Sequence, residues 1–188
     1  RSYRGPSLIL ETWFETADGT VKLVDFMPPR GKASDVIRMV CGMRGRVRMR
    51  MELILRFGFG SDIPWVRRSA DGDAVLASCG QDMTAWRTPV TSRGDHLTTV
   101  AEFEVSEGES IPFVLTYGPS HLDVPAAVDP QKALEETAAF WAEWSARCSY
   151  RGPYRDLVLR SLITLKALTF APTGGIVAAA TTSLPEKL

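Results

Sequence analysis

The chain of 188 residues is poor in the residues that make covalent cross-links, metal sites and membrane spans. Its three cysteines, Cys41, Cys79 and Cys148, lie far apart and form no C-x-x-C pair, so we expect neither a disulfide framework nor a zinc site. This cysteine usage favours a reducing compartment, and we predict a cytoplasmic location. The longest aliphatic run, 176–180, is far shorter than the roughly 20 apolar residues that cross a bilayer. No membrane partner is expected.

The sequence also lacks charge of one sign. Lys and Arg number 22, Asp and Glu also number 22, and the formal net charge is zero. No global field would concentrate nucleic acid or an anionic membrane around such a chain. The first residue is Arg1 rather than Met, and no secretory signal pattern follows it, so we expect a piece of a longer protein.

The first two thirds of the chain are typical of short strands separated by turns. Alternating apolar and polar residues recur between turn signals such as Asp18-Gly19 and Asp71-Gly72. The expected strands cover 7–16, 21–27, 35–41, 46–57, 65–69, 74–79, 83–88, 97–105 and 110–117. Such a run of strands predicts an antiparallel β-sandwich.

The pattern changes after Gly118-Pro119, where a stretch rich in Pro, Ala and Val runs to Val128. Asp129-Pro130 then predicts a helix start, because Asp caps free N–H groups and Pro loses no bond at the first helical position. The apolar stripe expected on this first helix is Leu134, Thr137, Ala138, Trp141, Trp144 and Cys148. A second helix is expected from Tyr154 to about Ala171, with a stripe of Leu157, Val158, Ser161, Leu162, Leu165 and Leu168. An extended segment over 176–180 follows.

A row of arginines is the most conspicuous charge feature of the sequence. Its members are Arg44, Arg46, Arg48, Arg50 and Arg56. A basic strand face can hold phosphates. The alternative that we favour is neutralisation, because ten acidic residues and a single Lys132 lie between Asp95 and Ala146. We therefore expect no nucleic-acid partner.

Self-contained catalytic patterns are scarce. The two histidines, His96 and His121, have no metal or triad spacing, and Ser120-His121 does not match the G-x-S-x-G elbow. Gly58-Phe59-Gly60 lacks the third glycine of a dinucleotide loop. The acidic candidates for an inverting pair are Glu102, Glu104, Glu135, Glu136 and Glu143, which we expect on solvated faces rather than in a cleft. We expect no cofactor and no metal.

The last third of the chain carries a family resemblance. The run FWAEWSARCSYRGPYRDLVLRSLITLKALTFAPTGGIVAAATTSLPE, residues 140–186, resembles bacterial members of glycoside hydrolase family 15, the glucoamylase and trehalase-like enzymes. The resemblance extends upstream to LETWFETADGTVKLVDFMP at 10–28, RGRVRMRMEL at 44–53 and FVLTYGPSH at 113–121. It therefore covers nearly the whole chain.

The resemblance implies mainly β and then α structure: an antiparallel β-supersandwich, a linker helix and the first helix of an (α/α)6 toroid. The implied domains are the sandwich at 1–118, the linker with its helix at 119–153, and an incomplete catalytic domain from 154 to 188. It also implies that Trp141, Trp144 and Tyr154 pack the helices together rather than bind sugar.

The activity implied by the resemblance is hydrolysis with inversion of α,α-trehalose or of α-linked glucan ends. The two catalytic glutamates of the family would lie beyond Leu188, so no catalytic residue is assigned to this chain, and we expect it to be inactive alone. Thr181, Thr182 and Ser183 match the loop before the family's substrate-holding segment, which implies a place near the pocket rim or, as the alternative, a structural cap on the first toroid helix.

Two other functions remain open from the sequence alone. One is a free-standing carbohydrate-binding sandwich, which needs an exposed aromatic platform built from residues such as Trp13, Trp65 or Trp86. The other is a structural or interaction module. The exposure of these tryptophans separates the first alternative from the second.

Overall fold

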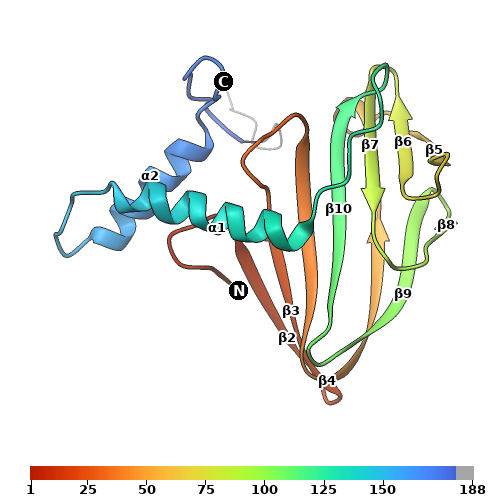
Figure 1. Cartoon of the computed structure of the whole chain (residues 1–188), viewed down its shortest axis with the longest axis horizontal. Helices are drawn as coiled ribbons and strands as arrows, with labels where there is room; N and C mark the ends of the chain where they lie inside the picture. Colours follow the sequence, from red (N-terminus) through yellow and green to blue (C-terminus); the bar gives the residue numbers. More distant parts are fainter. Residues whose placement is uncertain (181–188) are drawn as a thin grey trace.

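The computed structural model describes residues 1–180 and shows two antiparallel sheets followed by two helices (Figure 1). This arrangement confirms the predicted sandwich with a helical tail. The strands are β1 (Ser2–Tyr3), β2 (Leu10–Glu15), β3 (Gly19–Phe26), β4 (Ser34–Leu53), β5 (Trp65–Arg68), β6 (Val75–Cys79), β7 (Asp82–Arg87), β8 (Arg93–Asp95), β9 (Thr98–Ser106) and β10 (Ser110–Pro119). A short 3-10 turn, η1, spans Gly58–Gly60. The helices are α1 (Pro130–Ala146) and α2 (Arg155–Ala167).

The larger sheet has the strand order β1-β2-β3-β4-β10-β7-β6-β5, and every pair in it is antiparallel. We call it the large sheet. The second half of β4 leaves it and pairs with β9, which pairs in turn with β8. We call this three-stranded unit the small sheet. The two-residue strand β1 and the three-residue strand β8 are too short to show a period of two in the sequence, and neither was predicted.

The strand β4 belongs to both sheets, which corrects the prediction of separate strands at 35–41 and 46–57. Residues 34–41 pair with β10, and residues 46–53 pair with β9. The corner between them contains Gly42 and Gly45, and Gly45 has a φ of 65°, which favours glycine. A Cβ on Gly42 would collide with the Ser106 backbone, and one on Gly45 with the Asp18 backbone. The two glycines thus let one strand turn from the first sheet into the second.

The main core lies between the two sheets. Alternate residues of β4, which include Val47, Met49 and Met51, face the large sheet, as the sequence predicted. They pack with Trp86 and Phe113, whose rings stack at a centroid distance of 6.3 Å. The opposite face of the small sheet carries the arginine row and is exposed to solvent.

The helix α1 covers the other face of the large sheet (Figure 1). Ala133 and Leu134 pack there against a buried group from the strands and from the segment before β2. That group comprises Ile9, Val24, Phe26, Ile37, Met39 and Val114. Asp129 caps the helix as predicted, because its carboxylate accepts hydrogen bonds from Gln131 N at 2.9 Å and Lys132 N at 3.1 Å. The large sheet is therefore the middle layer of three.

The helix α2 packs against α1 through a face that only partly matches the predicted stripe, because Val158 and Leu162 of that stripe pack against the shared cluster. Leu159 and Ile163, neither of which was in that stripe, are buried against Trp141 and Cys148. Leu157 and Leu165, which were in it, are exposed. Apolar residues surround much of this short helix, so its periodicity alone could not choose the buried side.

The aromatic residues of the helices divide in the same way. Trp141 is buried and Trp144 packs partly against the same cluster, so both have the predicted packing role. Tyr154 is 65% exposed, and its predicted packing is not found among residues 1–180. The predicted extended segment 176–180 shows one isolated bridge, between Thr169 and Ile176.

The N-terminal segment ties the helices to the sandwich. Arg160 of α2 donates to the Ser7 carbonyl at 2.8 Å and the Gly5 carbonyl at 3.4 Å, and its guanidinium lies 4.4 Å from the centre of the Tyr3 ring. Ser145 of α1 donates to the Pro6 carbonyl at 3.1 Å. Neither helix in the described part of the chain is long and apolar enough to cross a membrane.

Candidate functional site

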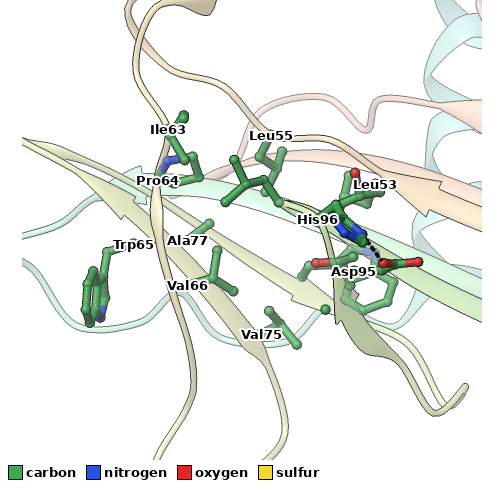
Figure 2. Close-up of a pocket in the computed structure, with 15 residues that line it drawn as sticks. Leu53, Leu55, Ile63, Pro64, Trp65, Val66, Val75, Ala77, Asp95 and His96 are labelled. Atoms are coloured by element: carbon green, nitrogen blue, oxygen red, sulfur yellow. Dashed lines mark hydrogen bonds and ion pairs between the residues drawn. The ribbon is translucent and has the colours of Figure 1, made fainter.

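The residues that the family resemblance placed near a sugar pocket, Thr181, Thr182 and Ser183, lie outside the described residues. Residues 1–180 form an apolar hollow at one side of the sandwich, between β5 and the β8–β9 hairpin (Figure 2). We call it the edge pocket. Its cavity volume is 330 Å³, within the usual size range of small-ligand pockets.

The edge pocket reaches into the core between the two sheets. Its apolar wall includes Leu53, Leu55, Ile63, Val66, Val75 and Trp86. Trp86 belongs to the buried core, whereas Ile63 and Val66 are more than half exposed. The pocket is therefore an unsealed part of the core rather than a separate cavity.

Polar groups of the edge pocket come from the tight turn between β8 and β9. His96 Nδ1 lies 2.7 Å from Asp95 Oδ1 (Figure 2). His96 and Leu97 have φ values of 44° and 63°, a backbone conformation that residues other than glycine rarely adopt. Sequence reasoning dismissed His96 for want of spacing, and no signal in the sequence brought this turn next to β5.

A His–Asp contact is part of a hydrolytic triad only when a nucleophile lies next to the imidazole. Among the described residues, no hydroxyl or thiol is hydrogen-bonded to His96, whose side chain is 99% exposed. The edge pocket can thus hold apolar groups and offers one carboxylate, but it lacks the machinery of acyl or glycosyl transfer.

The acidic candidates for an inverting pair are on solvated faces, as expected. Glu102 and Glu104 pair with arginines of β4, and on α1 Glu136 lies 3.8 Å from Lys132 and Glu143 lies 2.8 Å from Arg147. Glu135 accepts from Gln131 at 2.8 Å. Residues 1–180 hold no group of His, Cys, Asp and Glu side chains arranged to bind a metal ion, and the three cysteines are free.

The Ser120-His121 pair has no catalytic geometry. Ser120 donates its hydroxyl hydrogen bond to the Gly80 carbonyl at 2.7 Å, which holds the start of the linker against the β6–β7 turn. His121 is exposed. Further along the linker, Arg87 of β7 donates to the Pro125 carbonyl at 2.8 Å and to Asp73 at 2.7 Å. These contacts are structural.

Three members of the arginine row, Arg46, Arg48 and Arg50, pair with neighbouring carboxylates, as we expected for the whole row. Arg48 lies 3.1 Å from Glu104, and Arg46 lies 3.6 Å from the same carboxylate. Arg50 contacts Glu52 at 2.8 Å and Glu102 at 3.3 Å. The carboxylates come from β9 and β4 themselves and not from the helix. Arg44 and Arg56 have no carboxylate within 4.0 Å among residues 1–180, so the neutralisation covers the part of the row that lies on the small sheet.

The tryptophans that could have formed a sugar-binding platform are dispersed. Trp86 is buried, Trp13 is 46% exposed and Trp65 is 79% exposed. Trp13 is on β2 and Trp65 on β5, toward opposite edges of the large sheet. Lys22 already lies over the Trp13 ring at 5.3 Å. The exposed tryptophans do not combine into one flat platform.

A second hollow, of 710 Å³, lies between the loop joining β3 to β4 and the linker before α1. Its charged residues are of both signs and include Lys32, Asp123, Lys132 and Glu136. Glu136 is the ion-pair partner of Lys132. We find no pair of free carboxylates in this hollow among the described residues.

Two shifted pKa values report local hydrogen bonding away from the edge pocket. Partial burial tends to raise the pKa of the Glu11 carboxyl, but the hydrogen bond from Arg4 and the charge of Lys22 prevail and hold it below its usual value. The Tyr117 hydroxyl donates to Asp82, and this hydrogen bond raises the pKa of the tyrosine. Both are contacts between neighbouring strands or segments.

Comparisons with known proteins connect the chain to one group of enzymes. It is 27% identical over 186 residues to a trehalase of Thermoplasma acidophilum, covering 97% of this chain and 32% of that protein. It is 29% identical over 172 residues to a trehalase of Thermoplasma volcanium, covering 89% of this chain and 27% of that protein. A trehalase of Mycobacterium tuberculosis is 33% identical over 87 residues, covering 46% of this chain and 13% of that protein. No protein-family model matches the chain.

These similarities confirm the resemblance to trehalase-like enzymes that the sequence motifs indicated. The chain spans about a third or less of the length of the curated relatives that it matches.

Proposed function

We propose that this chain is the β-sandwich and first helical part of a glycoside hydrolase of family 15. The chain is related in sequence to curated trehalases along nearly its whole length. The proposed substrate of the whole enzyme is α,α-trehalose, with α-linked glucan ends as the alternative. This chain supports the catalytic domain and is inactive by itself. The observation that carries the proposal is the similarity to trehalases over 97% and 89% of the chain.

The placement of the glutamates in residues 1–180 supports a supporting role for this part and a catalytic role for the rest of the proposed enzyme. An inverting glycosidase needs two carboxyl groups about 6.5–9.5 Å apart in a cleft, one of them acting as acid and the other as base. The glutamates of the small sheet and of α1 are instead paired with arginine, lysine or glutamine on open surfaces. In this proposal the general acid and base come from a part of the protein that the chain does not contain.

The exposed face of α2 supports a continuation of the helical layer. Leu157, Leu165 and Tyr154 remain exposed beside the packed face of Leu159 and Ile163. In the proposed enzyme, α2 is the first helix of the (α/α)6 toroid, and later helices cover this face. The proposed boundaries remain those of the sequence analysis, with the sandwich at 1–118, the linker at 119–153 and the toroid from 154.

The location and the pocket rim are parts of the same proposal. A cytoplasmic location is supported by three cysteines that are all free. Thr181, Thr182 and Ser183 keep their proposed place near the rim of the sugar pocket. The carbohydrate-binding alternative is weakened, because Trp13 and Trp65 lie toward opposite edges of the sheet.

The experiment compares the purified chain with the product of the longest reading frame that contains it. We expect glucose release from trehalose by the longer protein and none by the chain. Proton NMR of the first products reports the stereochemistry: inversion releases one α- and one β-glucose from each α,α-trehalose, whereas retention releases α-glucose alone. Maltotriose, assayed in parallel, tests the alternative substrate.

Two results would contradict the proposal. Glucose release that follows the concentration of the chain through repurification would show that the described part is itself catalytic. A folded longer protein that hydrolyses neither trehalose nor maltotriose would refute the assigned activity.

A further inference from the structure

The edge pocket lies where each sheet ends in an edge strand, which is paired on one side only. Among residues 1–180, β5 pairs only with β6, and β8 pairs only with β9. One hydrogen bond bridges the two edges, from Arg68 Nη2 to the Ser92 carbonyl at 3.3 Å. The sandwich is therefore open on this side, and the edge pocket is the opening.

The hydrogen-bond pattern shows which backbone groups of β5 are unused. Ser69 N donates to the Ala74 carbonyl at 2.8 Å, and the register sets these two residues opposite each other. Hydrogen-bonded pairs alternate along an antiparallel ladder, so Arg67 and Trp65 also bond toward β6. The backbone N–H and C=O groups of Val66 and Arg68 consequently point away from β6, outward from the sheet.

The side chains of β5 give this edge a particular chemistry. Val66 lines the edge pocket and is 51% exposed (Figure 2). Arg68, two residues along, extends from the same face of the strand, and its Nη2 donates to the Ser92 carbonyl. Arg67 is on the opposite face, with Trp65. Neither Arg67 nor Arg68 has a carboxylate within 4.0 Å in the described part of the chain, in contrast to Arg46, Arg48 and Arg50.

From these features we propose that β5 is a docking edge for an extended acidic segment of a partner protein, which adds a strand to the large sheet. The partner's backbone pairs with Val66 and Arg68. An apolar side chain opposite Val66 enters the edge pocket, and carboxylates face Arg67 and Arg68. This is strand addition, in which the backbone gives affinity and alternate side chains give specificity.

Charge decides between such a partner and a second copy of this chain. Antiparallel self-pairing that joins Val66 of one copy to Arg68 of the other sets Arg67 opposite Arg67. Like charges directly opposite each other across a ladder are destabilising, and charged edge residues commonly prevent edge-to-edge association. An acidic strand converts the same arginines into ion-pair partners.

The test titrates two terminally blocked peptides into the full chain by isothermal calorimetry. One contains the sequence Glu-Glu-Ile, which in antiparallel pairing sets Ile opposite Val66 and the two glutamates opposite Arg67 and Arg68, and the other has Lys at each Glu position. We expect the acidic peptide to bind and the basic peptide not to bind. Sedimentation velocity of the chain alone, run at the same concentrations, should show no self-association through β5.

Three variants locate the binding. Val66→Pro removes the outward N–H while leaving the bonds toward β6, and Pro is tolerated on edge strands. We expect it to weaken acidic-peptide binding about tenfold, the equivalent of one lost hydrogen bond of about 1.4 kcal/mol. Val66→Thr, the matched control, keeps the N–H and should bind within about twofold of the parent. Circular dichroism checks that each variant is folded.

The double variant Arg67→Glu with Arg68→Glu keeps the test decisive if Val66→Pro fails to fold. We expect it to lose the acidic peptide and to gain the basic one. Absence of binding by either peptide, equal binding of both, or binding that the charge reversal leaves unchanged would each overturn the proposal. Self-association that Val66→Pro abolishes would overturn it in favour of a second copy.

Discussion

The two edges of the large sheet differ in how far neighbouring parts of the chain hold them. At the β1–β2 edge, the N-terminal segment folds back, Glu11 of β2 pairs with Arg4 at 2.8 Å, and Arg160 of α2 holds the backbone of the same segment. At the β5 edge, four consecutive exposed residues lie beside an opening into the core. An edge can thus be closed by the segment that precedes β2 together with a helix, or left available and guarded by charge.

The difference follows from what the sequence places near each edge. Residues 2–9 supply backbone carbonyls that α1 and α2 can reach. The residues beside β5 are the loop with η1 and the short β8 hairpin, and neither supplies a covering strand. The closed edge joins the sandwich to the helices, whereas the open edge faces outward and is free to dock.

The largest expected change in the free energy of unfolding distinguishes a core residue of the edge pocket from a residue at its rim. Trp86→Ala should lower the free energy of unfolding by about 3–5 kcal/mol, because it leaves a cavity between the sheets. Trp65→Ala, at a residue 79% exposed, should change it by less than about 0.5 kcal/mol. Urea unfolding followed by circular dichroism measures both. Equal losses would mean that the β5 edge is as firmly packed as the core.

The next effect tests the clamp at the closed edge. Arg160→Ala removes charge-assisted hydrogen bonds to Ser7 and Gly5 and the contact with Tyr3, and should cost about 1.5–3 kcal/mol. Arg147→Ala is the matched control on α1. Its exposed pair with Glu143 is worth about 0.3–0.5 kcal/mol.

Hydrogen exchange shows where the Arg160 clamp acts. The amides of residues 3–9 should exchange faster in Arg160→Ala, while those of β6 and β7 stay unchanged. Loss of protection throughout the sandwich would show that the helices are required for the sheets to fold, and the two edges would then no longer be independent.

A smaller effect depends on pH and also belongs to the closed edge. The pKa of Glu11 is lower in the folded chain than its ordinary value of 4.5, so its stabilising contribution is present above that value and is lost as pH falls through the folded-state pKa. Glu11→Gln should therefore be less stable than the parent at neutral pH, and the difference should vanish in acid. Urea unfolding at several pH values between 3 and 7 checks this. A difference that stays constant with pH would contradict the pairing with Arg4 and Lys22.

The smallest effect is expected on the outer face of the small sheet. Arg48→Ala should change stability by no more than about 1 kcal/mol, because its pair with Glu104 is exposed. Because Arg46, Arg48 and Arg50 are paired with carboxylates, labelled DNA and RNA should show no binding in fluorescence anisotropy at physiological salt. Binding that weakens steeply with salt and disappears when Arg46, Arg48 and Arg50 become Ser would make this face a nucleic-acid surface.

Local sequence patterns determined most of the elements. Period-two alternation and turn signals located the strands from β2 to β10 to within a few residues, apart from the short β8 and the joining of two predicted strands into β4. Asp129-Pro130 located the start of α1, because capping is a local interaction. The acidic surplus after Asp95 indicated the partners of Arg46, Arg48 and Arg50, since Glu102 and Glu104 of the neighbouring strand pair with them.

Only the tertiary structure decided how the elements meet. Gly42 and Gly45 gave no periodic signal, yet they let β4 serve both sheets, because the demand for glycine comes from the Ser106 and Asp18 backbones across the corner. Leu159 and Ile163 rather than Leu157 and Leu165 are buried in α2, because α1 covers only one side of a helix whose apolar residues lie on more than one side. The edge pocket exists because β5 and β8, nearly 30 residues apart in the sequence, end their sheets on the same side. Periodicity reports which residues avoid water, whereas the partner that covers them depends on contacts between distant parts of the chain.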